Sequence, residues 1–376
     1  MTDTALAEVF PPGEFIRDEL EERGWTQSDL AAIMGRPLTV LNEIITGKRA
    51  VTPETATELG AAFGTSAEFW LNLESFYRLS TTNRPEDAIR YRARLYELAP
   101  LKDMQKRHWI KECDSETEAH SELLRFFNVA SLDDIRNMKI AARATGGIAQ
   151  DPTPAQYTWC RQSLVLAQTV PAAKYDSTAL RAGLEQLRQL AFDREETRKV
   201  PRVLSSLGIR FVVVEHLPRS RIDGAALWLD NRSPVVALSM RYDRIDSFWH
   251  TLCHELAHVL NEDGQGQLDI ELFVKGRIAA GERQAIERRA DDAAAAMLIN
   301  PSDLEGFIRR KKPYYSKQAI IQFANRLGIH PGVIVGQLQY RGEIGYYANR
   351  EMLVKVRDIV VREALTDGWG HFVAQD

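Results

Sequence analysis

The most constraining feature of this chain is the pattern His-Glu-x-x-His formed by His254, Glu255 and His258. Positions four apart lie on one face of an α-helix, so the two imidazoles can face one metal ion. Glu255 is rotated by about 100° from His254 and therefore borders such a metal without having to bind it. Two imidazoles and one carboxylate suit zinc and leave one coordination position for water. The pattern predicts a zinc site on a helix, with Glu255 as a general base.

The residues around this pattern have the spacing of an amphipathic helix. The apolar positions are Phe248, Trp249, Leu252, Leu256, Val259 and Leu260. Such spacing predicts one helix across residues 247–261, with its apolar side in a core. The alternative is a buried helix that carries two incidental histidines.

A third metal ligand is expected on a second helix, across residues 282–299, which is rich in alanine and ends before a proline. Glu287 and Asp291 are four apart and share one face of this helix. We expect Glu287 to bind the metal and Asp291 to hold a ligand histidine in one tautomer, with Asp291 as the alternative ligand. The competing interpretation is a solvated helix, because Arg288 and Arg289 are also charged.

These residues resemble the ImmA/IrrE family of metallopeptidase-like domains. The resemblance rests on His254-Glu-Leu-Ala-His258, followed by Glu287-Arg-Arg-Ala-Asp291 and a proline. It extends upstream to the strand-like residues 235–239 and downstream to the helical residues 319–339. The resemblance implies a zincin-like fold of the gluzincin type, in which two histidines come from the first helix and a glutamate from the second. It also implies a protease-like domain that acts on a repressor or another partner protein.

Residues 12–79 show the pattern of five short helices. The expected helices are 14–23, 26–34, 39–45, one opened by Pro53 after a cap at Thr52, and 66–79. Two short helices joined by a tight glycine turn inside such a set are typical of a helix-turn-helix. The segment resembles the Xre/Cro helix-turn-helix family, and within it the HigA-type antitoxins, through Asn42-Glu-Ile-Ile-Thr-Gly-Lys-Arg49 and Thr52-Pro-Glu-Thr55.

That second resemblance implies a double-stranded DNA operator and a cognate toxin as partners. By position it implies that Gln27 and Ser28 contact the phosphate backbone, as do Lys48 and Arg49. The residues that it places at base edges, on and before the third helix, are Arg36, Leu38, Thr39, Val40 and Asn42.

The charge of this segment bears on how it would bind DNA. Residues 14–78 contain six Lys and Arg against eleven Asp and Glu. Because non-specific affinity for DNA comes mainly from cationic contacts, we expect a monomer to bind weakly. A homodimer joined through the aromatic fifth helix would compensate. The alternative is a helical bundle that only binds a partner protein.

The remaining segments connect and complete these two parts. Residues 86–200 read as helices, with a solvated charged face expected at 102–111. Strands are expected at 208–215 and in a hairpin of 224–229 with 235–239. An exposed strand beside the histidine helix would pair with an extended peptide, so we expect the substrate cleft at that sheet edge.

The composition of the whole chain limits the classes of protein that fit. The 376 residues include 48 Lys and Arg against 52 Asp and Glu, a net charge of −4, which gives no general attraction to nucleic acid or to anionic membranes. The three cysteines form no C-x-x-C pattern, as expected in a reducing compartment. We find no secretion signal and no run of about 18 apolar residues. A cytoplasmic protein with no membrane partner is therefore expected.

Together these features predict a mainly α fold with a small β-sheet, of the α+β class. We expect a five-helix helix-turn-helix domain at 1–80, a helical bridging region at 81–200 and a zinc metallopeptidase domain at 201–345. Residues 346–376 would form a C-terminal helix and tail, a final strand or a lid.

The predicted function is that of an antitoxin-like transcriptional regulator with a peptidase that cuts a partner or repressor protein. Two alternatives stay open. In the first, the metallopeptidase fold serves only to dock a toxin or ligand and cuts nothing. In the second, the chain cleaves itself near a polar linker at 81–85. No group is assigned to stabilise the oxyanion, for which His250, Tyr314, Tyr315 and Arg341 are candidates.

Overall fold

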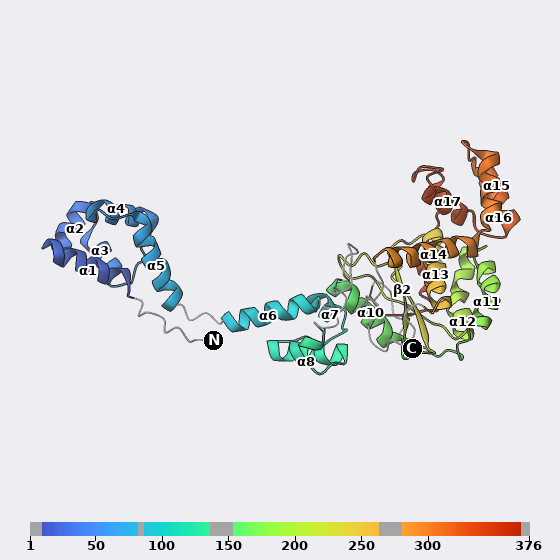
Figure 1. Ribbon diagram of the computed structural model, residues 1–376, viewed down its shortest axis with the longest axis horizontal. Coiled ribbons are helices and arrows are strands. Elements are labelled where there is room, and N and C mark those ends of the chain that lie inside the picture. The colour runs from blue at the N-terminus through green and yellow to red at the C-terminus, as the bar shows by residue number, and fades with distance from the viewer. Residues whose placement is uncertain (1–9, 82–85, 136–152, 263–279, 370–376) are drawn as a thin grey trace. The chain divides into compact units, whose positions relative to one another are not determined.

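The computed structural model describes residues 10–81, 86–135, 153–262 and 280–369 (Figure 1). The chain divides into two compact units, Met1–Ile89 and Arg90–Asp376. Most of the expected linker, residues 82–85, lies outside the described residues. The fold is mainly helical with one four-stranded sheet, as the sequence predicts.

The first unit is a bundle of five helices around one core. The helices are α1 (Pro12–Arg23), α2 (Gln27–Met34), α3 (Leu38–Ile45), α4 (Pro53–Phe63) and α5 (Ala67–Thr81). Each helix supplies at least one side chain that is almost completely buried: Ile16, Leu30, Leu41, Leu59 and Trp70. Burial of such side chains provides the main stabilisation of a bundle of this size.

The helix ends in this unit follow from local chemistry. The Thr26 side chain accepts a hydrogen bond from the backbone N–H of Asp29, and the Asp29 carboxylate accepts one from the backbone N–H of Thr26. This reciprocal pair satisfies two backbone donors at the start of α2. Gly35 ends α2 in a left-handed conformation, which glycine adopts without steric cost. Thr52 caps α4 with Pro53 at its first position. The expected cap at Thr52 is confirmed, and Thr26 caps α2.

The second unit is built around a small mixed sheet. Its strands are β1 (Arg210–Val213), β2 (Gly224–Trp228), β3 (Pro234–Leu238) and β4 (Leu365–Thr366). The order is β2-β3-β1-β4, with β2 antiparallel to β3 and β1 parallel to both β3 and β4. The predicted hairpin is confirmed, and β4 is a final strand near the C-terminus. Among the described residues β2 has a strand on one side only, so its other side is an open edge.

Alternate residues of the strands enter two different cores, because successive side chains of a strand point to opposite faces of the sheet. Phe211 and Val213 of β1 belong to one core, and Val212 belongs to the other. Likewise Val236 and Val235 of β3 lie on opposite faces. All five of these side chains are buried. The sheet is therefore covered on both faces, which explains why its strands read as continuous apolar runs.

Different helices cover the two faces of the sheet. One core includes residues of α6 (Glu86–Leu98), α7 (Leu101–Lys106), α8 (Glu116–Phe127) and α10 (Pro154–Ala167). The other includes residues of α11 (Ser177–Leu190), α12 (Val200–Ser206), α13 (Ile245–Leu260), α14 (Ala280–Leu298), α15 (Pro301–Lys311), α16 (Lys317–Leu327), α17 (Pro331–Tyr340) and α18 (Arg357–Val360). In Figure 1, α10 lies on one side of the strands and α11 and α12 lie on the other. The described part of this unit also contains the 3-10 helices Arg194–Lys199 and Arg350–Met352.

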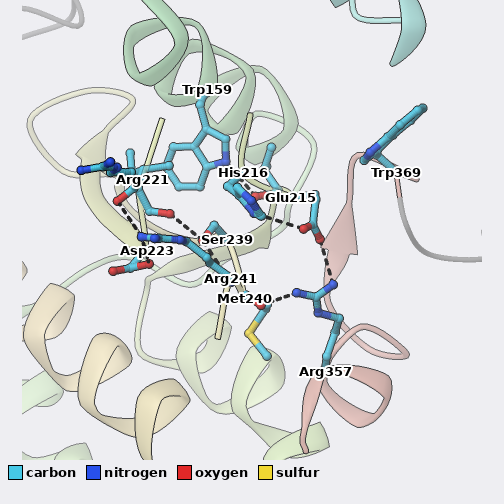
Figure 2. A network of polar contacts seen from close by, with 12 residues as sticks. Trp159, Glu215, His216, Arg221, Asp223, Ser239, Met240, Arg241, Arg357 and Trp369 are labelled. Carbon is cyan, nitrogen blue, oxygen red and sulfur yellow. Dashed lines mark hydrogen bonds and ion pairs between the residues drawn. The ribbon is translucent and has the colours of Figure 1, made fainter. Parts of the chain in front are cut away.

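Buried and half-buried charged residues hold the last part of the chain against the end of β1. Figure 2 shows Arg357 between the Glu215 carboxylate, 3.1 Å away, and the carbonyl oxygen of Met240. Arg107 donates hydrogen bonds of 2.6 and 2.8 Å to the carbonyl oxygens of Glu215 and His216. Its guanidinium also lies 3.5 Å from the buried carboxylate of Asp367, whose pKa is raised to about 6 by burial. The C-terminal segment is thus a structural part of the second unit.

Within the described residues, no helix has both the length and the apolar character that a membrane span requires.

Candidate metal centre and helix-turn-helix surface

Helix α13 presents the His-Glu-x-x-His pattern because its other side is held in a core. The expected apolar positions are all buried: Phe248, Trp249, Leu252, Leu256, Val259 and Leu260. This side packs toward the sheet and the surrounding helices. The helix orientation is therefore fixed by burial, and His254 and His258 are left on the side that meets α14.

Three side chains from α13 and α14 bring ligand-type atoms together. The Nε2 atoms of His254 and His258 lie 3.1 Å apart. The Oε2 atom of Glu287 lies 3.3 Å from His254 Nε2 and 3.8 Å from His258 Nε2. One potential ligand atom from each residue falls within 4.8 Å of the others. The structure thus places the three predicted metal ligands around one point.

The spacing of these atoms fits a tetrahedral zinc site. Zinc binds imidazole nitrogen and carboxylate oxygen at roughly 2.0–2.2 Å, which at tetrahedral angles separates neighbouring ligand atoms by about 3.3 Å. The observed separations of 3.1, 3.3 and 3.8 Å lie around this value. Two imidazoles with one carboxylate are also a donor set that zinc accepts, with a fourth position left for another ligand. The residues present therefore fit the metal that the sequence predicts.

Asp291 occupies the position expected of a residue that orients a ligand histidine. Its Oδ1 atom lies 2.8 Å from Nδ1 of His254, on the opposite side of the ring from Nε2. A proton on Nδ1 would be shared with this carboxylate, which leaves the Nε2 lone pair free to face Glu287. Asp291 faces Nδ1 of His254, whereas Glu287 and His258 face Nε2. This arrangement favours Asp291 as the orienting residue over Asp291 as a metal ligand.

Glu255 is buried beside the ligand pair and contacts the open strand β2. Only 7% of its surface is exposed, and burial raises the pKa of its carboxyl to about 7. It forms a hydrogen bond with the backbone of Ala226 in β2. A Cβ on Gly224 would lie 2.9 Å from Oε1 of Glu255 and 2.8 Å from Cγ2 of Thr251. A glycine at this position therefore allows β2 to approach the carboxylate.

The electrostatics of the ligand group favour a bound positive charge. Hydrogen bonds from His254 and then His258 hold the pKa of Glu287 far below its usual range. Burial acts to lower the pKa of His254, but the hydrogen bond to Glu287 and the charge of Glu255 outweigh it, so that this pKa is raised. A carboxylate facing two imidazoles at these distances needs either a proton or a metal ion between them.

The candidates for an oxyanion stabiliser lie at different places. The His250 ring centre is 6.3 Å from that of His254, whereas the Tyr314 side chain is 84% exposed. Tyr315 donates a 2.8 Å hydrogen bond to Glu343. Arg341 lines a cavity of about 740 Å³ that also borders His250. The structure therefore brings none of these four to the ligand atoms directly.

The same cavity contains residues that sequence reasoning missed. They include Arg244, Asp246, Tyr340 and Tyr346. These residues come from three separated segments and follow no motif, so no local pattern connects them. The packing of α13 against α17 and the residues after α17 brings them to one cavity.

In the first unit, α3 exposes part of the predicted DNA-contact set. Leu38 is 41% exposed, and Thr39 and Asn42 are also exposed on α3. Val40 is half-buried and packs against the core of the bundle. Ser28 is exposed at the start of α2, where Gln27 is half-buried.

Two of the predicted cationic contacts are engaged within the bundle itself. Arg36 forms hydrogen bonds of 2.5 and 3.0 Å with Glu58. Arg49 lies 2.8 Å from Glu43, and both side chains are exposed to about half of their surface. Lys48 is exposed. Contacts of Arg36 or Arg49 with a phosphate would therefore compete with these ion pairs.

Helix α5 carries an exposed apolar surface, here called the α5 apolar face. It consists of Phe69, Phe76 and Leu79, which are 40%, 67% and 68% exposed. Large apolar side chains gathered on one helix often mark a surface that another protein covers.

The first unit resembles known DNA-binding proteins. Residues 16–70 match the helix-turn-helix family. The uncharacterized HTH-type transcriptional regulator YddM of Escherichia coli (strain K12) is 32% identical over 81 residues, which are 22% of this chain and 86% of that protein. Virulence-associated protein I of Dichelobacter nodosus is 33% identical over 79 residues, or 21% of this chain and 73% of that protein. Through residues 16–70 the chain therefore belongs to the helix-turn-helix family.

Proposed function

We propose that this protein is a DNA-binding transcriptional regulator whose second unit is a zinc-dependent peptidase acting on a partner or repressor protein. The observation that carries the peptidase part is the set of three ligand-type atoms within 4.8 Å of one another on α13 and α14. The helix-turn-helix family carries the regulatory part. A toxin is one candidate for the partner, as expected of an antitoxin-like protein.

For DNA recognition, α3 is the helix proposed to enter the major groove. Leu38, Thr39 and Asn42 are exposed on it and are placed to meet base edges. Arg36 and Val40 belong to the same proposed set, although Val40 is half-buried. Gln27, Ser28, Lys48 and Arg49 are proposed to contact phosphates, which position the unit without reading sequence.

A homodimer is proposed to supply the affinity that one bundle lacks. The excess of acidic residues in 14–78 opposes binding to the DNA backbone. Two copies joined through the α5 apolar face would bury Phe76 and Leu79 and double the number of phosphate contacts.

We expect Asn42→Ala to weaken binding of the full chain to its selected operator by about ten- to a hundredfold, because one base contact is lost. Lys48→Ala should weaken binding to all sequences alike and lower the salt dependence by about one phosphate contact. Fluorescence anisotropy on oligonucleotides selected from a random pool by the unaltered protein measures both. Thr57→Ala, exposed on α4, is the control. Unchanged operator affinity in Asn42→Ala would remove α3 from the proposed interface.

For the hydrolytic step, the proposed centre combines a cation site with a buried base. Zinc held by His254, His258 and Glu287 would lower the pKa of water in its open position to about 7. Glu255 is proposed to accept a proton from that water, because its carboxylate is buried and feels the charge of both imidazoles. The open edge of β2 would pair with an extended segment of the substrate and hold its backbone beside Glu255.

We expect the purified protein to take up one zinc per chain, and His254→Ala or Glu287→Ala to abolish this uptake at micromolar zinc. Asp291→Asn should lower zinc affinity by roughly ten- to a hundredfold, because His254 loses the group that orients it. Elemental analysis after dialysis and competition with a zinc-binding dye measure these effects. His108→Asn, exposed and outside the site, is the control. Absence of uptake by the unaltered protein would overturn the metal site.

The two alternative functions make different predictions for the zinc-loaded protein. A docking scaffold would bind zinc and its partner without cutting any protein. A self-cleaving regulator would release a fragment of about 80 residues on a mass spectrum, because the expected linker lies at 81–85. Cleavage of a separate partner without such a fragment supports the proposed function.

A further inference from the structure

The cavity next to the proposed metal site has a defined chemical character. Its volume is about 740 Å³, and it lies among α13, α14 and α17. Asp291 lines it on one side and also orients His254 through the 2.8 Å contact to Nδ1. At the start of β2, Asp223 lines it as well. The cavity therefore lies beside both the ligand group and the open strand.

The charges that line this cavity favour a cation. Four aspartates line it, Asp223, Asp246, Asp291 and Asp292, against the two arginines Arg244 and Arg341. Arg244 is already committed to Asp246, with hydrogen bonds of 2.6 and 3.0 Å, and to Gln339. Asp223 also lies 3.5 Å from Arg241, and Asp291 bonds to His254, so these two carboxylates are already engaged. Across the whole lining, four aspartates still exceed two arginines. An anionic guest would meet net repulsion here, whereas a cationic guest would be attracted.

The uncharged lining suits a guest with an apolar stem and a cationic end. Tyr340 and Tyr346 border the cavity and are 70% and 67% exposed. Tyr242 borders it as well, but the Arg241 guanidinium already lies over its ring, 4.9 Å from the ring centre. The faces of tyrosine rings attract ammonium and guanidinium groups. Ala295 and Leu298 of α14 add an apolar wall. The side chains of lysine and arginine combine these two properties, since a methylene stem carries the charge.

The position of the cavity relative to β2 places it within reach of a bound peptide. In an extended peptide alternate side chains point to one face of the sheet. Asp223 immediately precedes β2, and Thr251 and His250 of α13 also line the cavity. A peptide along the edge of β2 would therefore direct one side chain past α13 toward this space.

From these features we infer that the cavity is a specificity pocket for one basic side chain, arginine or lysine, of the protein that the second unit cuts. This inference rests on the proposed function, because it assigns the substrate class of the same site. An acidic side chain would meet the excess of aspartates over arginines in the lining.

A binding experiment tests the pocket separately from cleavage. The probes are two fluorescein-labelled ten-residue peptides of alternating valine and serine, with a central arginine in one and citrulline, its uncharged isostere, in the other. Anisotropy is recorded on the full-length, zinc-loaded Glu255→Gln protein, which does not consume the probe. We expect the arginine peptide to bind about tenfold more tightly, the scale of a cation–π contact plus a partly screened charge pair.

Matched variants assign this preference to the cavity. Asp292→Asn should reduce the arginine preference to about threefold or less, because it removes one charge from the lining. Tyr340→Ala should weaken binding of the arginine peptide more than that of the citrulline peptide. Glu305→Gln removes an exposed negative charge on α15, outside the lining, and should leave the preference unchanged.

The outcomes separate this inference from the proposed function. Equal binding of the two peptides, or tighter binding of a peptide with central glutamate, overturns the basic pocket. Cleavage by the unaltered zinc protein with no preference for basic residues also overturns it while the peptidase stands. A preference for arginine that depends on Asp292, without any cleavage by the unaltered protein, supports the pocket and removes the peptidase.

Discussion

Glu255→Gln is expected to lower the rate of partner cleavage by about a thousandfold while zinc uptake stays at one per chain. A positioned general base typically contributes 10²–10⁴-fold, and glutamine keeps the shape of the side chain but cannot accept the proton. The buried position of Glu255, 7% exposed, leaves little room for bulk water to replace it. Cleavage is measured by mass spectrometry of the partner under single-turnover conditions, with elemental analysis of zinc on the same sample.

Two comparisons make this result specific. Cys253→Ala, at a buried neighbour of the motif whose thiol pKa is raised to about 12 by burial, should retain cleavage. This thiol has no role in the proposed chemistry. If Glu255→Gln cuts as fast as the unaltered protein, another group accepts the proton and the proposed mechanism is wrong.

Gly13→Ala is expected to destabilise the first unit by at least about 3 kcal/mol, because the added Cβ has no space. It would lie 2.0 Å from the carbonyl oxygen of Ile45, the last residue of α3. The obstacle is backbone, so relief requires α1 and α3 to move apart. The higher helix propensity of alanine offsets only about 1 kcal/mol. Hydrogen exchange of the full chain, followed by mass spectrometry, should show lost protection in peptides from residues 10–81.

The same variant tests how far the two units depend on each other. Glu22→Ala, exposed on the same helix α1, should leave protection unchanged and serves as the control. Peptides from 153–262 should exchange as in the unaltered protein, because the second unit has its own cores. Operator binding should be lost together with protection of the first unit. Full protection in Gly13→Ala would show that α1 and α3 adjust without cost.

The parts of the fold and site that sequence predicts are those set by short-range spacing. His254 and His258 share a face of α13 because they are four residues apart. The apolar residues elsewhere on the helix determine which of its faces is buried. Glu287 and Asp291 follow the same rule on α14. The chemistry of zinc ligands predicts that these two residues approach the histidines of α13. In the structure Glu287 lies beside His254 and His258, and Asp291 contacts His254. Caps such as Thr26 are equally local and equally predictable.

Features that depend on distant partners could not be predicted in this way. Arg107 lies in the stretch 102–111, which sequence patterning assigns to a solvated face, and Lys102 is indeed exposed. Arg107 is instead buried, because it bonds to Glu215 and pairs with Asp367, residues far along the chain. The Arg36 pair with Glu58 likewise joins two different helices. No periodicity or motif in the sequence indicates such contacts.

The two-sided covering of the sheet determines which fragments of the second unit can be isolated. One face of the strands is covered by residues of α7, α8 and α10, all of which precede residue 200. A fragment beginning at residue 201 would expose the side chains of Val212, Leu227 and Val235 as a continuous apolar surface. Such a fragment should aggregate, whereas one beginning near residue 90 keeps its cover. Helix α13 and the sheet therefore cannot be separated from the helices that precede residue 200.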